Sequence, residues 1–174
     1  MASVRVAIIG PVCSGKTTTL GHLRDRLAAE GLSVGGVLQP ALRRPEGPAD
    51  YVLEDAETGA QCAFVTRDPA TAKPIFDTAG WTWAASRIRG ARETRDVVVV
   101  DELGIVEARG EGHLPALVEP LASERARLWI VAVRQSSAAR LEAHLGAWDL
   151  VTPPNPDWDS LLAAIHARLA VPPV

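Results

Sequence analysis

The fold of this chain is decided by one short stretch, Gly10-Pro11-Val12-Cys13-Ser14-Gly15-Lys16-Thr17. It follows the pattern G-x-x-x-x-G-K-[ST], in which two glycines allow a tight loop whose backbone N–H groups point inward at a phosphate. In such a loop Lys16 reaches the β- and γ-phosphate oxygens, and the hydroxyl of Thr17 ligates Mg²⁺. The stretch therefore predicts a P-loop that binds a nucleoside triphosphate through these eight residues and the following Thr18, with Mg²⁺ as the cofactor.

The residues on either side of the loop have the patterns that this motif requires. Residues 4–9 form an apolar, β-branched run that predicts a buried parallel strand. After the loop, Leu20, Leu23 and Leu27 recur at helical spacing, and Gly31 is typical of the end of a helix. We therefore expect a strand, the phosphate loop and a helix in direct succession, with the positive end of the helix dipole at the phosphate site.

Strands and helices are expected to alternate along most of the remaining chain. Apolar runs predict further strands over residues 33–38, 96–101, 128–133 and 149–151. Helical spacing predicts helices over residues 79–92, 115–125 and 137–146, and from an N-cap at Asp157 onward. This alternation is typical of an α/β fold with a mostly parallel central sheet flanked by helices.

An antiparallel excursion is expected to interrupt this order. Residues 51–55 and 61–65 predict a hairpin, with a loop over 41–50 before it and an irregular segment over 69–78 after it. The whole chain, residues 1–174, is predicted to be a single P-loop NTPase domain of the RecA-like, additional-strand type, with a β-hairpin insertion at about 41–68.

The composition argues against several classes of partner. A net charge of −3 is unlike the basic surface that binds nucleic acid. The two cysteines, one of them in the loop, are too few for a disulfide framework and fit a reducing compartment. The first expected strand begins at residue 4, and no apolar run approaches the ~20 residues that span a bilayer. We therefore expect a cytoplasmic protein that contacts neither nucleic acid nor membrane.

A second polar cluster follows the valine run at residues 97–100. These valines predict a strand that is buried on both faces and ends in Asp101 and Glu102, as in a Walker B motif. We predict that Asp101 holds Mg²⁺ through water and that Glu102 orients or deprotonates the attacking water. Glu107 lies near the same edge, either as a further carboxylate of the site or, as the pattern favours, as a solvated loop residue.

The segment after the valine run also carries a distinctive series of acidic residues and glycines, Asp101-Glu102-Leu103-Gly104, Glu107 and Gly110-Glu111-Gly112-His113. This series resembles one in the small P-loop nucleoside-triphosphatases, the family that includes the cancer-related nucleoside-triphosphatase. Further similar segments lie at residues 36–43, 55–59, 131–134 and 151–157. The resemblance implies Mg²⁺-dependent hydrolysis of nucleoside triphosphate to diphosphate and phosphate, with loose base selectivity, so that ATP, GTP and others are the expected substrates.

Four residues depart from the pattern of that family. Gln39, Ala41, His113 and Pro156 stand where the family has Thr, Glu, Phe and Arg. The loss of polar groups around the second strand predicts either an altered nucleotide preference or weaker hydrolysis with binding intact. The chain is therefore interpreted as a divergent member of the family.

Three further polar residues are candidates for the same site. Arg134 ends the strand expected over residues 128–133, where it could stabilise the charge that develops on the γ-phosphate, and Arg43 is a second candidate for this role. Asn155, in the loop before the last helix, is expected to approach the base. With no arginine supplied by a partner, turnover should be slow, on the order of 10⁻³–10⁻² s⁻¹ by analogy with unassisted GTPases.

Two other functions remain open at this point. A nucleotide or small-molecule kinase would need an arginine-bearing lid, and a Glu directly after Asp101 favours water as the acceptor. A GTP-binding accessory protein of molybdenum cofactor maturation would share the Gly-Lys-Thr-Thr-x-Leu pattern, but the Asn/Thr-Lys-x-Asp tetrad for guanine does not occur. The sequence thus favours a hydrolase in which Lys16, Glu102 and Arg134 are the catalytic residues.

Overall fold

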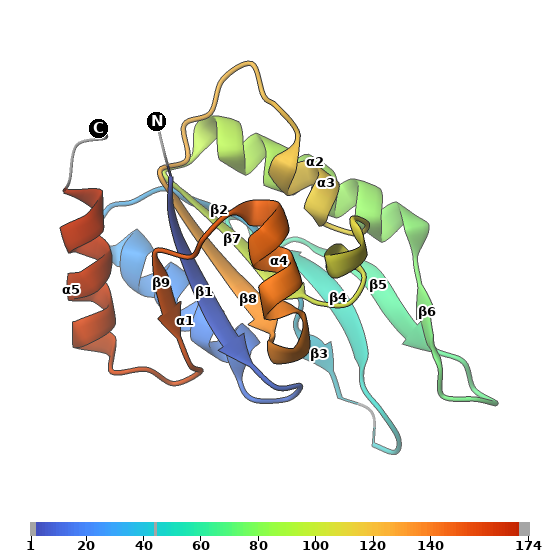
Figure 1. Ribbon diagram of the computed structural model, residues 1–174. Helices are drawn as coiled ribbons and strands as arrows, with labels where there is room; N and C mark the ends of the chain where they lie inside the picture. The colour runs from blue at the N-terminus through green and yellow to red at the C-terminus, as the bar shows by residue number, and fades with distance from the viewer. Residues whose placement is uncertain (1–2, 44, 171–174) are drawn as a thin grey trace.

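Nine strands form one sheet in the computed structural model, which describes residues 3–43 and 45–170 (Figure 1). Along the sheet the strands follow the order β6-β5-β4-β2-β7-β8-β1-β9, and β3 pairs with β4 beside this path. Strands β2, β7, β8, β1 and β9 run parallel to one another and are called the parallel half. Strands β3 to β6 pair antiparallel and are called the antiparallel extension.

The parallel half contains the strands that the apolar runs predicted. Its members are β1 (Val4–Gly10), β2 (Val34–Leu38), β7 (Val97–Leu103), β8 (Leu128–Arg134) and β9 (Leu150–Thr152). The four valines at residues 97–100 are at most 1% exposed, which confirms that β7 is covered on both faces. Strand β8 lies between β1 and β7 and pairs with both. This order confirms the predicted α/β fold with an additional strand between the P-loop strand and the Walker B strand.

Helices cover both faces of the sheet, as the alternating pattern predicted (Figure 1). They are α1 (Lys16–Ala29), α2 (Thr78–Thr94), α3 (Leu114–Val118), α4 (Ala138–Leu145) and α5 (Trp158–Leu169). Apolar residues of α1 and α5 pack with Val97 and Val99 in one core, whereas those of α2, α3 and α4 pack with Val98 and Val100 in the other. Among the described residues, no helix combines the length and the apolar character needed to cross a membrane.

The antiparallel extension is longer than the predicted hairpin. It consists of β3 (Ala41–Leu42), β4 (Asp50–Asp55), β5 (Gln61–Arg67) and β6 (Pro74–Phe76). The expected hairpin is present as β4 and β5, but the expected loop over 41–50 begins with β3, and the segment expected to be irregular contains β6. The extension therefore continues past residue 68 to Phe76.

A turn at Asp68 explains the additional strand. Its carboxylate Oδ1 accepts hydrogen bonds from the backbone N–H groups of Ala70 and Thr71, at 2.9 and 2.8 Å. An Asp side chain that binds the backbone two and three residues ahead reverses the chain. The reversal returns β6 to β5, where Ile75 pairs with Thr66.

The helix expected over 115–125 is shorter than predicted, because α3 ends at Val118. Pro120 disfavours a helical conformation at the residue before it, and Glu119 is extended, with φ −60° and ψ 141°. The buried Arg92 of α2 donates hydrogen bonds to the carbonyl oxygens of Ala116 and Glu119 at this end. Helical spacing cannot reveal a contact between residues 24 to 27 positions apart, so the predicted helix extended beyond Val118, where α3 ends.

Candidate active site

The P-loop joins the end of β1 to the start of α1 and has the backbone conformation that the motif requires. Gly15 and Cys13 both lie in the left-handed region, with φ 91° and 59°. At Gly10 an added Cβ would lie 2.6 Å from Ser14 Oγ and 3.0 Å from Pro154 Cγ. A side chain at that position would therefore push apart the loop and the segment that packs on it.

Lys16 is turned inward at the start of α1 and is only 3% exposed. Its Nζ donates a hydrogen bond to the carbonyl oxygen of Pro11 at 2.8 Å and lies 3.6 Å from Glu102 Oε2. The ammonium group is thus held above the loop, between a loop carbonyl and the carboxylate at the end of β7. A phosphate bound in the loop would be a third partner within reach of the same group.

A bulge at the end of β7 presents Asp101 and Glu102 together. The register between β7 and β8 shifts between Val100 and Leu103, and Glu102 adopts a left-handed φ of 56°. Strict alternation would turn Leu103 to the face of Val99, but it packs in the core on the opposite face, together with Val100. The extra residue therefore lets two consecutive carboxylates lie at the P-loop edge of the sheet.

Asp101 is buried and has bonding capacity left for a ligand. Its Oδ2 accepts a hydrogen bond from Gln39 N at 3.0 Å, whereas its Oδ1 has no partner among the described residues. Burial raises the pKa of Asp101 to about 6, although the nearby Thr17 side chain and the Gln39 N–H act in the opposite direction. A carboxylate oxygen without a partner next to a hydroxyl is a donor set that suits Mg²⁺, which binds hard oxygen ligands. Thr17 and Asp101 therefore fit the predicted metal.

Arg134 comes from the end of β8 and completes a charged cluster around Glu102. Its Nη2 donates to Glu102 Oε1 at 2.8 Å, while Lys16 faces the other carboxylate oxygen. The guanidinium group lies across Gly104, where an added Cβ would be 3.5 Å from Nε. The structure therefore brings together the three residues that were predicted to be catalytic.

The loop after β9 packs on the P-loop and carries Asn155. Asn155 has a left-handed φ of 55°, and its backbone N–H donates to Thr19 Oγ1 at 3.1 Å. Its Nδ2 lies 3.8 Å from the position that a Cβ on Gly15 would take, so the side chain lies at the P-loop. Arg43 is different: it is exposed after β3, and in the described part of the chain no hydrogen bond or ion pair joins it to Lys16, Glu102 or Arg134.

Sequence reasoning missed the environment of Glu107 and His113. The interpretation of Glu107 as a solvated loop residue was wrong, because the side chain is 3% exposed and accepts hydrogen bonds from Gly104 N and His113 N. Burial also raises the pKa of Glu107. His113 is 1% exposed and lies against Phe64 and Trp81. The glycines around His113 were the available signal, because they allow the chain to close tightly over a buried group.

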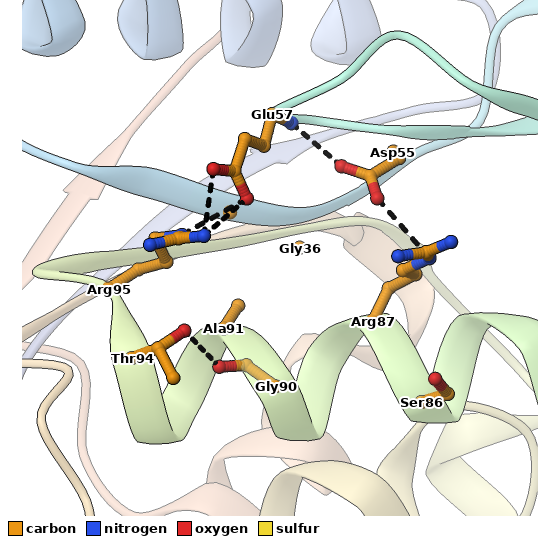
Figure 2. Close-up of a pocket in the computed structure, with 10 residues that line it drawn as sticks. Gly36, Asp55, Glu57, Ser86, Arg87, Gly90, Ala91, Thr94 and Arg95 are labelled. Atoms are coloured by element: carbon orange, nitrogen blue, oxygen red, sulfur yellow. Dashed lines mark hydrogen bonds and ion pairs between the residues drawn. The ribbon is translucent and has the colours of Figure 1, made fainter.

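A cavity of about 150 Å³ lies away from this cluster, between α2 and the turn that joins β4 to β5 (Figure 2). Figure 2 shows Arg87 of α2 facing Asp55 at the end of β4, and Arg95, the residue after α2, facing Glu57 in the turn. Arg87 Nε lies 3.2 Å from Asp55 Oδ2, and Arg95 Nη2 lies 2.7 Å from Glu57 Oε1. None of the residues that line this cavity was predicted to bind nucleotide, and its charges are paired with one another.

The chain is also similar in sequence to proteins of known family. A family model described as NTPase matches residues 5–165 of the chain. The chain belongs to the NTPase family. It is 31% identical over 140 residues to the nucleoside-triphosphatase THEP1 of Korarchaeum cryptofilum, an alignment that covers 78% of this chain and 69% of the relative. It is 27% identical over 157 residues to THEP1 of Thermofilum pendens, with 86% and 85% covered.

Two solved structures have the same fold. The solution structure of a human cancer-related nucleoside triphosphatase has a TM-score of 0.68 and 16% identity, and covers 97% of this chain and 98% of its own. The crystal structure of THEP1 from Aquifex aeolicus has a TM-score of 0.65 and 19% identity, with 95% and 99% covered. The comparisons confirm the predicted fold class and family, and with them the predicted hydrolysis of nucleoside triphosphates. Family membership favours this reaction over the kinase and accessory-protein alternatives.

Proposed function

We propose that the protein hydrolyses nucleoside triphosphates to diphosphate and phosphate at the edge where β1, β7 and β8 end, with Lys16, Glu102 and Arg134 as the catalytic residues. The observation that carries this proposal is the position of Glu102, whose two carboxylate oxygens face Arg134 at 2.8 Å and Lys16 at 3.6 Å. A carboxylate held between two cations beside a P-loop is suited to orient a water molecule toward the γ-phosphate.

The two cations have a further role in the proposed reaction. The transition state spreads negative charge over the γ-phosphate oxygens, and groups placed there in advance lower the barrier. In the structure Lys16 donates a hydrogen bond to the Pro11 carbonyl. We expect Lys16 to exchange this carbonyl for a phosphate oxygen when the loop is filled. Arg134 supplies the second positive charge from the end of β8. Its hydrogen bond to Glu102 Oε1 also fixes the orientation of that carboxylate.

Mg²⁺ is the proposed cofactor, and Thr17 and Asp101 are the residues that would hold it. When bound, the ion neutralises charge on the phosphate groups and fixes their orientation. The support is the chemistry of the donors: a buried carboxylate with one oxygen lacking a partner among the described residues, next to a hydroxyl. Mg²⁺ keeps several water molecules and takes phosphate oxygens as ligands, so a hydroxyl from Thr17 and a carboxylate of Asp101 that acts through water would be enough to hold it.

Broad base selectivity and slow turnover are the finer parts of the proposal. The loop from Pro153 to Pro156 carries three prolines, and Asn155 is its one polar side chain. Proline rings offer apolar contact and no hydrogen-bond donor to a base edge, which supports the use of ATP, GTP and other nucleoside triphosphates. Arg134 comes from the same chain and not from a partner. By analogy with GTPases that carry their own arginine, we expect a kcat on the order of 10⁻² s⁻¹ or below.

The experiment that tests this proposal is phosphate release from ATP, GTP, CTP and UTP, with Mg²⁺ and with excess chelator, for the native protein and Glu102→Gln. We expect release from all four nucleotides with Mg²⁺, none with chelator, and a kcat at least about tenfold lower in the variant. Glu93→Gln on the exposed surface of α2 is the matched control and should retain the native kcat. A native kcat in Glu102→Gln would remove this residue from the mechanism.

Nucleotide binding can be followed in the same proteins through the exposed thiol of Cys13 in the P-loop. In a Cys62→Ser background, modification of Cys13 by a disulfide reagent should be slowed by the Mg²⁺–nucleotide complex. Glu102→Gln should retain this protection, because it removes a group that acts on water and leaves the loop intact. A loss of protection would mean that Glu102 serves binding and not catalysis.

A further inference from the structure

Glu107 closes the loop that follows β7 and belongs to η1 (Glu107–Arg109). Its two carboxylate oxygens have separate partners: Oε2 accepts from Gly104 N at 2.8 Å, and Oε1 accepts from His113 N at 3.2 Å. The side chain is 3% exposed, and no cation pairs with it in the described part of the chain. A buried carboxylate without a cation is costly, so its hydrogen bonds to the backbone are the contacts that keep it in place.

The surrounding loop is shaped to admit this carboxylate. Gly112 has a left-handed φ of 62°, and an added Cβ there would overlap Glu107 Oε1 and lie 3.1 Å from Cζ3 of Trp81. The absence of a side chain at Gly112 therefore leaves the space that the Glu107 carboxylate occupies. The aromatic rings of Trp81 and His113, with centroids 4.8 Å apart, close the space behind it.

Both N–H groups point at oxygen atoms, which makes a carboxylate the only common side chain of this length that satisfies them. The amide of glutamine has one oxygen and one NH₂ group, and the NH₂ group would face a backbone N–H donor. When the NH₂ group faces a backbone N–H group, one hydrogen bond is lost and the buried N–H group has no acceptor. In Glu107→Gln the NH₂ group therefore faces Gly104 N or His113 N, and because both bonds hold the same side chain, the repulsion displaces it from Gly104 in either orientation.

Gly104 connects this buried carboxylate to the site, because it lies two residues after Glu102 and packs against the guanidinium group of Arg134. Glu102 has a left-handed φ of 56°, a conformation that is unfavourable for a non-glycine residue and persists only where neighbouring contacts hold it. The contacts that flank it are the bond from Gln39 N to Asp101 on one side and the bond from Gly104 N to Glu107 on the other.

We propose that Glu107 is a positioning residue for hydrolysis. By holding Gly104 through its carboxylate, it keeps the bulge of β7 in the conformation that places Glu102 between Lys16 and Arg134. Glu107 does not touch the nucleotide in this arrangement and acts on the reaction through Glu102. The inference rests on the proposed role of Glu102.

The test compares kcat and nucleotide affinity in Glu107→Gln, Glu102→Gln, the double variant and Glu111→Gln. Glu111 is the matched control, because it is exposed in the same loop. We expect Glu107→Gln to lower kcat about tenfold with a Kd for nucleotide within about twofold of the native value, and Glu111→Gln to change neither. In the Glu102→Gln background, Glu107→Gln should lower kcat by less than about twofold further. The effects of two substitutions are not additive when one residue acts through the other.

The outcomes separate this inference from the proposed mechanism. A native kcat in Glu102→Gln would overturn the mechanism itself. A slow Glu102→Gln beside a native kcat in Glu107→Gln, or full additivity in the double variant, would overturn the positioning role alone. Equal losses of kcat and affinity in Glu107→Gln would also overturn it, because they would indicate general damage to the site.

A second variant covers the case in which Glu107→Gln fails to fold, which circular dichroism and thermal unfolding would show. Glu107→Asp keeps the charge but shortens the side chain by one methylene group, so one carboxylate cannot reach both Gly104 N and His113 N. We expect a folded protein with kcat lowered about threefold and an unchanged Kd. A native kcat in folded Glu107→Asp would contradict the proposal.

Discussion

The parallel half of the sheet and the antiparallel extension both carry buried or half-buried charged residues, but they use them differently. At the end of the parallel half, one oxygen of Asp101 has no partner among the described residues, and Lys16 is bonded to a loop carbonyl. At the extension the carboxylates already have cationic partners from the helix packed on it (Figure 2). Asp55 of β4 pairs with Arg87 of α2, and Glu57 in the β4–β5 turn pairs with Arg95 directly after α2.

This difference shows where a ligand can bind. A buried polar atom without a partner costs free energy in the folded protein, and a ligand that supplies the partner recovers that cost. Charges that already have partners gain little from a ligand, because a new contact replaces an old one. The parallel half therefore has the character of a binding site, and the extension has that of a structural support.

The largest effect is expected from the two lysines, one in each region. Lys16→Ala removes the buried ammonium group of the P-loop and should lower kcat/KM at least about a hundredfold, because a positioned charge on the transferring phosphate is lost. Lys73→Ala removes an exposed charge next to β6 and should leave kcat/KM unchanged. Phosphate release measures both. A Lys16→Ala variant within about tenfold of the native value would contradict the proposed site.

His113 is an exception to the comparison, because both of its ring nitrogens lack hydrogen-bond partners among the described residues although it is not one of the residues proposed to bind nucleotide. Burial lowers the pKa of His113 from 6.5 to about 4, so the folded protein binds fewer protons than the unfolded chain between these values. Stability should therefore fall as the pH drops below 6.5, by about 2 kcal/mol between pH 6.5 and pH 5. His113→Phe should remove this loss.

Urea denaturation of the native protein and His113→Phe at pH 7, 6 and 5 measures the difference. Glu107, whose carboxylate accepts a hydrogen bond from His113 N, has a raised pKa and acts in the opposite direction, but it is present in both proteins. The difference between the two pH profiles therefore isolates the imidazole. Parallel profiles would show that the ring is not held in its neutral form by burial.

Asp55 tests the structural character of the extension. Its Oδ1 accepts hydrogen bonds from Glu57 N and Thr58 N at 2.9 and 3.2 Å, and its Oδ2 faces Arg87. Asp55→Ala should lower the free energy of unfolding by about 1–2 kcal/mol, because two N–H groups lose their acceptor, and kcat should be unchanged. Asp55→Asn keeps an oxygen for both N–H groups and should lose less. A loss of kcat in either variant would mean that the extension contributes to catalysis.

The smallest effect is expected at Glu57, which pairs with Arg95 on the surface. The side chains are 46% and 32% exposed, and ion pairs of this kind contribute little. Glu57→Gln should change the free energy of unfolding by less than ~0.5 kcal/mol, as measured by urea denaturation. A loss above about 1 kcal/mol would indicate that the cavity in Figure 2 depends on this charge.

Much of the fold could be predicted because its signals are local. Four successive valines indicate a strand covered on both faces whatever their neighbours are, and Asp157 caps the last helix by accepting from Ser160 N, as expected. The errors came from contacts that the local pattern does not contain. Strand β6 depends on its pairing with β5, and the end of α3 depends on Pro120 and on Arg92 of another helix.

The same division applies to the site. That Lys16, Glu102 and Arg134 lie together could be predicted from a motif and from the ends of apolar strands, because the last residues of parallel strands lie at one edge of the sheet. The sequence by itself therefore determined the phosphate loop, the class of fold and the charges at its edge. Tertiary structure alone decided the bulge that gives Glu102 its orientation, and the burial of Glu107 and His113. These features depend on strand register and loop closure, which are set by residues far apart in the chain.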